Sequence, residues 1–143
     1  VMKELDAGPS AAERKGSGVQ VVLAPADAEA IATIRTERLR AKNEGRVLVV
    51  YVSAGWCEPC RALKKEIESG RLDARLGTIT LLAFDADRDV DRLAAGGYAF
   101  KFIPYVALPG ADGHVTEFLE ARGHGKEAWR ELLGKLDAWA ERG

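Results

Sequence analysis

Two continuous apolar runs dominate the hydrophobic pattern of the chain. Residues 47–52 read VLVVYV, and residues 79–84 read ITLLAF. Uninterrupted runs of this length, rich in β-branched residues, are typical of strands that are buried on both faces of a sheet. They predict the two central strands of the fold.

Three weaker segments complete the predicted sheet. Residues 19–23 and 105–108 are short and apolar, and each predicts a strand. Residues 115–119 alternate imperfectly, as an antiparallel return strand can. The turn residues at 110–113 read GADG, and they predict a hairpin between the last two strands.

Helical periodicity fills the segments between these strands. The first helix is predicted to follow Pro25, with Asp27 as its N-cap, and to end at Gly45. Its apolar stripe is expected at Ala30, Ile31, Ile34 and Leu39. In the last helix, residues 126–142, we expect one face to pack on the sheet rather than to bind a partner. That face contains Trp129, Leu132, Leu133, Leu136 and Trp139.

Shorter helices are predicted in the middle of the chain. One runs from Pro59 to about Ser69, residues 71–76 predict one further turn, and another short helix surrounds residues 92–94. The resulting order is β-α-β-α-β-α-β-β-α. It predicts an α/β domain with a central mixed sheet and helices on both faces.

Length and composition fit one globular domain. The chain has 143 residues, of which 47% are hydrophobic and 30% charged. We place the domain at residues 19–143 and predict a flexible leader at residues 1–18, which show no apolar periodicity. The net charge of −1 gives no basic stripe, so nucleic acid is not an expected partner. The sequence has no apolar stretch long enough for a membrane span.

The residues that carry chemistry come directly after the first long apolar run. Residues 56–60 read WCEPC and contain the only two cysteines, Cys57 and Cys60. A C-x-x-C at a strand-to-helix switch in a β/α pattern indicates a thiol–disulfide redox site. A structural zinc site is the weaker alternative, because zinc needs about four ligands. Only His114 and His124 could join the cysteines, and neither has finger spacing.

Thiol–disulfide exchange requires an exposed thiolate and a second thiol within reach. Cys57 stands where a helix begins, so the helix dipole stabilises its thiolate, and we assign it as the nucleophile. Cys60, one turn later and expected to be less exposed, is the resolving thiol. Pro59 suits the first helical turn and stiffens the site. Glu58 puts a negative charge beside the nucleophile and disfavours the thiolate, unless solvent screens that charge.

These residues resemble those of the thioredoxin-fold family. The resemblance rests on the W-C-x-P-C motif at residues 56–60, on Ile103-Pro104 before a later strand, and on Gly123 beyond the hairpin. It covers residue 19 to the C-terminus and implies a thioredoxin fold. Within the family, the chain looks closer to the C-terminal thioredoxin-like domain of the bacterial reductant transporter DsbD than to small cytosolic thioredoxins. The long first helix and the extra turn within residues 64–76 suggest this.

The resemblance also implies roles around the cysteine pair. Trp56 would cover the disulfide and shape the partner surface, and a place in the core is the alternative. The Ile103–Pro104 bond would be cis and face the cysteines, and the residue before the proline would offer backbone hydrogen bonds to an extended substrate segment. The isoleucine at this position, Ile103, resembles the residue found in the family members that act as reductants. Gly123 would let the backbone approach the disulfide closely, unless it is an ordinary turn glycine.

One departure from the family concerns proton transfer. Thioredoxins carry a buried acid six positions before the first cysteine, where this chain has Tyr51, and their partner lysine is replaced by Ala83. A tyrosine, with an ordinary pKa of about 10, is a poor base at neutral pH. Deprotonation of Cys60 is then expected to depend on water or on another group. The candidates are Asp85, Lys101 and His124, although a solvated loop is the competing place for His124.

The sequence thus predicts a thiol–disulfide oxidoreductase that reduces protein disulfides. A disulfide isomerase or oxidase, or a non-catalytic thioredoxin-fold adaptor, are the alternatives. We expect a monomer that has no cofactor besides the Cys57–Cys60 disulfide and depends on a separate upstream thiol reductant. The charged run at 85–89 predicts a solvated loop rather than a metal or partner site. The compartment stays open: periplasmic if a signal was removed from the N-terminus, cytoplasmic otherwise.

Overall fold

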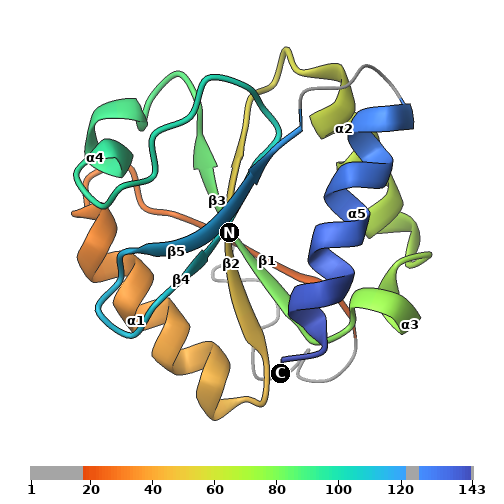
Figure 1. Cartoon of the computed structure of the whole chain (residues 1–143), viewed down its shortest axis with the longest axis horizontal. Coiled ribbons are helices and arrows are strands. Elements are labelled where there is room, and N and C mark those ends of the chain that lie inside the picture. The colour runs from red at the N-terminus through yellow and green to blue at the C-terminus, as the bar shows by residue number, and fades with distance from the viewer. Residues whose placement is uncertain (1–17, 122–125, 143) are drawn as a thin grey trace.

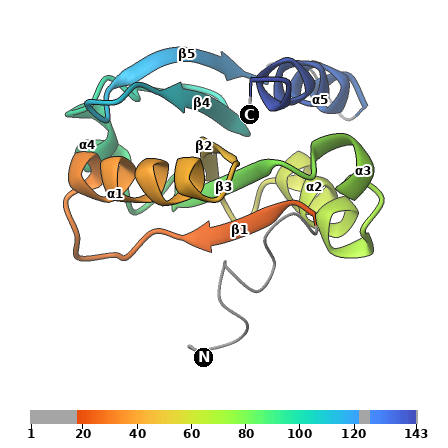
Figure 2. The same ribbon diagram turned by 90° about the horizontal axis from the view of Figure 1, so that it is seen from below.

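The computed structural model describes residues 18–121 and 126–142. Within these ranges it has a five-stranded sheet in the order β1-β3-β2-β4-β5. Its strands are β1 (Gln20–Leu23), β2 (Val47–Ser53), β3 (Ile79–Asp85), β4 (Tyr105–Pro109) and β5 (Val115–Glu120). Its helices are α1 (Ala30–Asn43), α2 (Glu58–Ser69), α3 (Asp73–Leu76), α4 (Val90–Ala94) and α5 (Lys126–Ala140). Helices α1 and α4 cover one face of the sheet, and α2, α3 and α5 cover the other (Figure 1, Figure 2), so the predicted α/β architecture is confirmed.

The central strand β2 pairs along both of its edges. It runs parallel to β3 over its whole length and antiparallel to β4, with Val52 opposite Tyr105. Residues 48–52 are all buried, because helices cover both faces of this strand. The predicted doubly buried strand is confirmed, and so is the antiparallel hairpin of β4 and β5.

The sheet separates two apolar cores. The core on the side of α1 and α4 contains Val50, Val52 and both cysteines. The core on the side of α2, α3 and α5 contains Tyr51. On α5, Leu132, Leu136 and Trp139 are buried in this second core, and Trp129 and Leu133 are partly buried against it. The predicted packing face of the last helix is therefore confirmed.

Two predictions about the first helix are wrong. The chain makes a turn around Asp27, and Glu29 is the N-cap instead, accepting a hydrogen bond from the Ala32 backbone N–H at 3.2 Å. Leu39 is 60% exposed. At about 100° per residue it lies roughly 140° around the helix from the fully buried Ile34, so it points to solvent. Near the end of α1, Ala41 rather than Leu39 is the buried residue.

A buried arginine holds the start of the domain through hydrogen bonds. Arg46 is only 5% exposed. Its guanidinium donates to Thr80 Oγ1 at 2.8 Å, to the Gly77 carbonyl at 2.8 Å, and to the carbonyls of Gly18 and Ile79 at 2.6 Å each. Gly18, the last residue of the predicted leader, is therefore tied to the domain. The rest of that leader lies outside the described residues.

We expect Arg46→Leu to lower the free energy of unfolding by about 3 kcal/mol, because it leaves several buried acceptors without donors. Urea unfolding followed by circular dichroism measures this change. Arg40→Leu is the matched control: its exposed guanidinium pairs only with Glu37 among the described residues, at 3.0 Å, and we expect a loss below about 1 kcal/mol. Equal losses in the two variants would contradict the assignment of Arg46 as the residue that holds the start of the domain.

Candidate active site

The cysteine pair occupies the turn between β2 and α2. Cys57 is the N-cap of α2, with extended backbone angles, and it forms a disulfide with Cys60 across a Cα–Cα distance of 5.2 Å. The Cys60 backbone N–H also donates to Cys57 Sγ at 3.3 Å. Pro59 lies in the first helical turn, as predicted. The nucleophile therefore sits at the positive end of the helix dipole, next to backbone N–H groups that the helix itself leaves unused.

The expected difference in exposure between the two cysteines is wrong for this oxidised state. Cys57 and Cys60 are each 4% exposed. The disulfide ties Cys57 to Cys60 within the first turn of α2, and both residues pack in the core on the α1 side. Ile103 packs against that same core. The two sulfur atoms are therefore recessed. We call the rim the residues beside the Cys57–Cys60 turn and beside the Ile103–Pro104 bond, which surround this core position.

Trp56 forms part of this rim. Its side chain is 65% exposed, so the alternative place in the core is wrong. Its indole Nε1 donates to Asp87 Oδ2 at 2.9 Å. On the other side of the turn, Arg61 Nη1 donates to the Gly55 carbonyl at 2.7 Å. The sequence analysis did not single out Arg61, although it directly follows the motif.

A buried carboxylate, that of Asp89, stabilises the loop that contains Asp87. Asp89 is 1% exposed, so the predicted solvated loop is wrong at this residue. Its Oδ1 accepts from Arg88 Nε at 2.8 Å and from Arg92 Nε at 2.9 Å, and its Oδ2 accepts from the Asp85 backbone N–H at 2.8 Å. Burial raises the pKa of the Asp89 carboxyl, but the hydrogen bonds from Arg88, Arg92 and the Asp85 backbone outweigh burial and hold this pKa at about 2.

The Ile103–Pro104 peptide bond is cis, as the resemblance implied. Pro104 is buried, and its carbonyl accepts from the Ala121 backbone N–H at 3.0 Å. The exposed Phe102, with 45% of its surface accessible, directly precedes this bond. Phe102 is a rim residue that the sequence analysis missed, although an aromatic residue two positions before the proline was a visible signal.

Tyr51 cannot act as the proton acceptor that was expected six positions before Cys57. It is 7% exposed and lies opposite Ala83 in the sheet register, as the resemblance implied. Burial raises the pKa of Tyr51 to about 12, although a hydrogen bond with Ser53 lowers it in part. The phenol therefore stays protonated at neutral pH, and its ring packs in the core on the opposite side of the sheet from the one that holds the cysteines.

The other candidates for the proton acceptor of Cys60 are Asp85, Lys101 and His124. Asp85 Oδ1 accepts from the backbone N–H groups of Asp87 and Arg88 at 2.8 and 3.1 Å, so it braces the loop. Lys101 is exposed in the segment before Pro104. Gly123 and His124 lie outside the described residues. Glu58 is exposed in the first turn of α2, where a carboxylate is favourable to the helix dipole.

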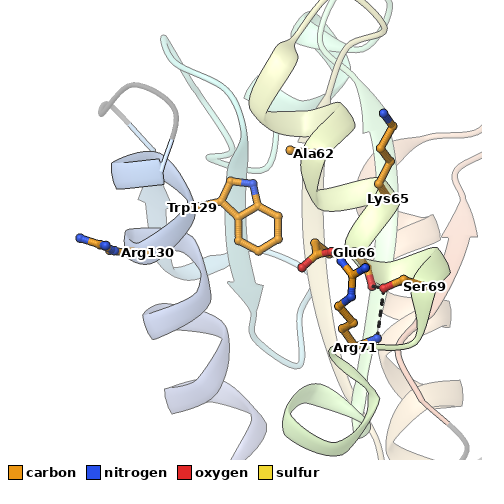
Figure 3. A pocket seen from close by; sticks show the side chains of 7 residues that line it. All are labelled: Ala62, Lys65, Glu66, Ser69, Arg71, Trp129 and Arg130. Atoms are coloured by element: carbon orange, nitrogen blue, oxygen red, sulfur yellow. Dashed lines mark hydrogen bonds and ion pairs between the residues drawn. The ribbon is translucent and has the colours of Figure 1, made fainter.

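A separate groove of about 610 Å³ lies between α2 and α5 (Figure 3). The Trp129 ring points from α5 toward α2, where the Arg71 guanidinium pairs with Glu66 and the Arg71 backbone N–H donates to Ser69 Oγ at 3.2 Å. The lining residues are Ala62, Lys65, Glu66, Ser69, Arg71, Trp129 and Arg130. Since no residue of the W-C-x-P-C motif lines it, this groove is not the redox site.

Solved structures share this architecture. A disulphide isomerase from Xylella fastidiosa Temecula1 superposes with a TM-score of 0.55 at 20% identity, covering 79% of this chain and 95% of its own. The thioredoxin of Trichomonas vaginalis superposes with a TM-score of 0.52 at 17% identity, covering 80% and 96%. The chain has a thioredoxin fold. A mutant thioredoxin from Halobacterium salinarum NRC-1 also matches, with a TM-score of 0.50 at 20% identity, covering 86% and 91%.

No protein-family model matches this thioredoxin-fold chain, and no curated protein matches its sequence. Within residues 18–121 and 126–142, no three His, Cys, Asp or Glu side chains gather as metal ligands would. No helix in the described part of the chain has the length and apolarity to cross a membrane. The predicted closeness to the DsbD domain stays a prediction.

We expect Asp89→Asn to lower the free energy of unfolding by about 2 kcal/mol at pH 7. The folded-state pKa of about 2 lies below the ordinary value of 3.8. The ionised carboxylate therefore stabilises the fold above about pH 4, and this contribution is lost as the pH falls through about 2. Denaturant unfolding at pH 7, 4 and 2.5 should show the difference between wild type and variant shrinking with pH. The exposed Asp91→Asn is the control, and a constant difference for Asp89→Asn would contradict the prediction.

Proposed function

We propose that this chain reduces disulfide bonds in other proteins by exchange with the Cys57–Cys60 pair. The observation that carries the proposal is a C-x-x-C disulfide at the N-terminus of α2, packed in one core with Ile103 of the cis Ile103–Pro104 bond. The thioredoxin fold supports thiol–disulfide oxidoreductase chemistry in general. The direction of electron flow is the proposed part.

The exchange proceeds in two displacements. The Cys57 thiolate attacks one sulfur of the substrate disulfide, which forms a mixed disulfide and releases the other sulfur as a thiolate. The Cys60 thiolate then attacks Cys57 Sγ, closes the Cys57–Cys60 disulfide and releases the second substrate thiolate. Two electrons pass to the substrate, and both released thiolates take protons from solvent or neighbouring acids. The protein ends in the oxidised state that the structure describes.

Cys60 must lose its proton for the second displacement. Because Tyr51 stays protonated at neutral pH, we propose that water at the rim accepts this proton. Regeneration of the dithiol requires a separate thiol reductant, since the sequence has no flavin or nicotinamide motif. Other proteins with disulfides, and that reductant, are the proposed partners.

Two features support reduction over oxidation. The dipeptide between the cysteines is Glu58-Pro59, and it lacks a histidine that would favour the Cys57 thiolate and thereby the reduced form of the protein. An isoleucine directly before the proline, as at Ile103, resembles the family members that act as reductants. Disulfide isomerisation is the second candidate, because a disulphide isomerase is among the structures that superpose on the chain.

We expect Cys57→Ser to abolish the reduction of insulin by dithiothreitol above the uncatalysed rate, because no nucleophile remains at the helix N-terminus. Cys60→Ser should also lose turnover. When it is reduced, freed of dithiothreitol and then mixed with insulin, it should form a covalent adduct with the substrate, which mass spectrometry under non-reducing conditions detects. Lys64→Ser, on the exposed part of α2, is the control and should keep full activity. Undiminished turnover in either cysteine variant would rule out the proposed chemistry.

The reduction potential of the pair decides between the two candidates. We expect a value closer to the roughly −270 mV of thioredoxin than to the roughly −180 mV of protein disulfide isomerase. Equilibration with dithiothreitol and glutathione buffers, read by alkylation of the free thiols, measures this potential. A value at or above about −180 mV would favour isomerisation instead.

A further inference from the structure

The segment before the cis proline lies outside any helix or strand. Residues 99–103 belong to the connection between α4, which ends at Ala94, and β4, and none of them lies in a helix or strand. They place the exposed Phe102 next to Ile103, which packs against the core that holds both cysteines. Some other interaction must therefore fix the conformation of this segment, because irregular backbone without partners is costly to order.

Glu120 provides that interaction. Its Oε1 accepts from the Lys101 backbone N–H at 2.6 Å and lies 3.4 Å from the Phe102 backbone N. A carboxylate acceptor makes such hydrogen bonds shorter and roughly twice as strong as those between neutral groups. One side chain thus holds two consecutive peptide groups of the irregular segment.

The place of Glu120 in the sheet explains why it reaches them. Glu120 is the last residue of β5 and lies opposite Tyr105, the residue directly after Pro104. The next residue, Ala121, holds the Pro104 carbonyl through its backbone N–H. The end of β5 therefore holds the chain on both sides of the cis bond, by a backbone hydrogen bond on one side and by the Glu120 carboxylate on the other.

We infer that Glu120 is a positioning residue for protein substrates, an inference that rests on the proposed function. The cysteines are each only 4% exposed, while Trp56 and Phe102 are 65% and 45% exposed, so a protein disulfide must contact the rim before it reaches the sulfurs. A rim that is already ordered costs less conformational entropy on binding. Glu120 orders the half of the rim that Phe102 and Ile103 form. Its carboxylate binds the backbone of Lys101 and Phe102, so we assign it no role in the chemistry of the sulfurs. A small disulfide has less surface than a protein and should depend less on this part of the rim.

The test compares Glu120→Ala and Glu120→Gln with Glu117→Ala. Glu117 lies on the same strand, but its side chain contacts Trp139, Arg142 and Lys135 of the α5 side, so Glu117→Ala controls for general weakening of β5. We expect Glu120→Ala to raise KM for insulin about tenfold with kcat within twofold of wild type. Glu120→Gln keeps one oxygen acceptor and should restore KM to within about threefold. Glu117→Ala should leave KM unchanged.

A second readout separates positioning from damage to the redox pair. The second-order rate constant of each reduced variant with 2-hydroxyethyl disulfide should stay within twofold of wild type. If KM for insulin stays within twofold in Glu120→Ala, or if the rates with insulin and with the small disulfide fall by the same factor, the inference is wrong while the proposed function stands. If the wild-type chain itself leaves insulin disulfides intact, the proposed function is wrong and the inference falls with it.

Discussion

The register of β2 with its two neighbours fixes where every part of the candidate site lies. Val52, near the end of β2, is opposite Tyr105, the first residue of β4. Because the two strands are antiparallel, the turn that leaves β2 and the segment that enters β4 share one edge of the sheet. The cysteine motif belongs to the first and the cis proline to the second. Two segments more than 40 residues apart thus meet because of strand pairing alone.

Two further strand ends join this edge for the same reason. Ser53 is opposite Asp85 at the end of the parallel strand β3, so the loop that follows β3 brings Asp87 to Trp56. Tyr105 is opposite Glu120 at the end of β5, so Glu120 reaches the segment before the proline. A slip of one residue in any of these registers would turn side chains to the opposite face. The doubly buried β2 disfavours a slip against β3 or β4, because its apolar residues fill both cores.

The sequence predicted the elements well because their signals are local. Apolar runs identify β2 and β3, and the motif with its proline identifies the start of α2. The errors concern the hydrogen-bond partners and the exposure of single side chains, which the hydrophobic pattern does not encode. Asp89 was predicted to be solvated because its neighbours in the sequence are charged. In the structure Arg88 and Arg92 both donate to its carboxylate. Arg88 also donates to the Ala24 carbonyl, and Arg92 to the Ala28 carbonyl. The equal burial of Cys57 and Cys60 in the bridged pair is likewise not encoded in the sequence pattern.

Side-chain hydrogen bonds help to order the end of the sheet that holds the candidate site. Asp87 holds Trp56, Arg61 holds the Gly55 carbonyl, and Glu120 holds the backbone before Ile103. Each of these interactions is exposed and therefore adds little to the free energy of unfolding, compared with the apolar cores. Together they determine the shape of the rim around a recessed disulfide. In this fold the apolar cores hold the two cysteines in place, whereas exposed polar side chains hold the residues around them. If the proposed function holds, a substitution at the rim changes substrate preference without loss of the fold.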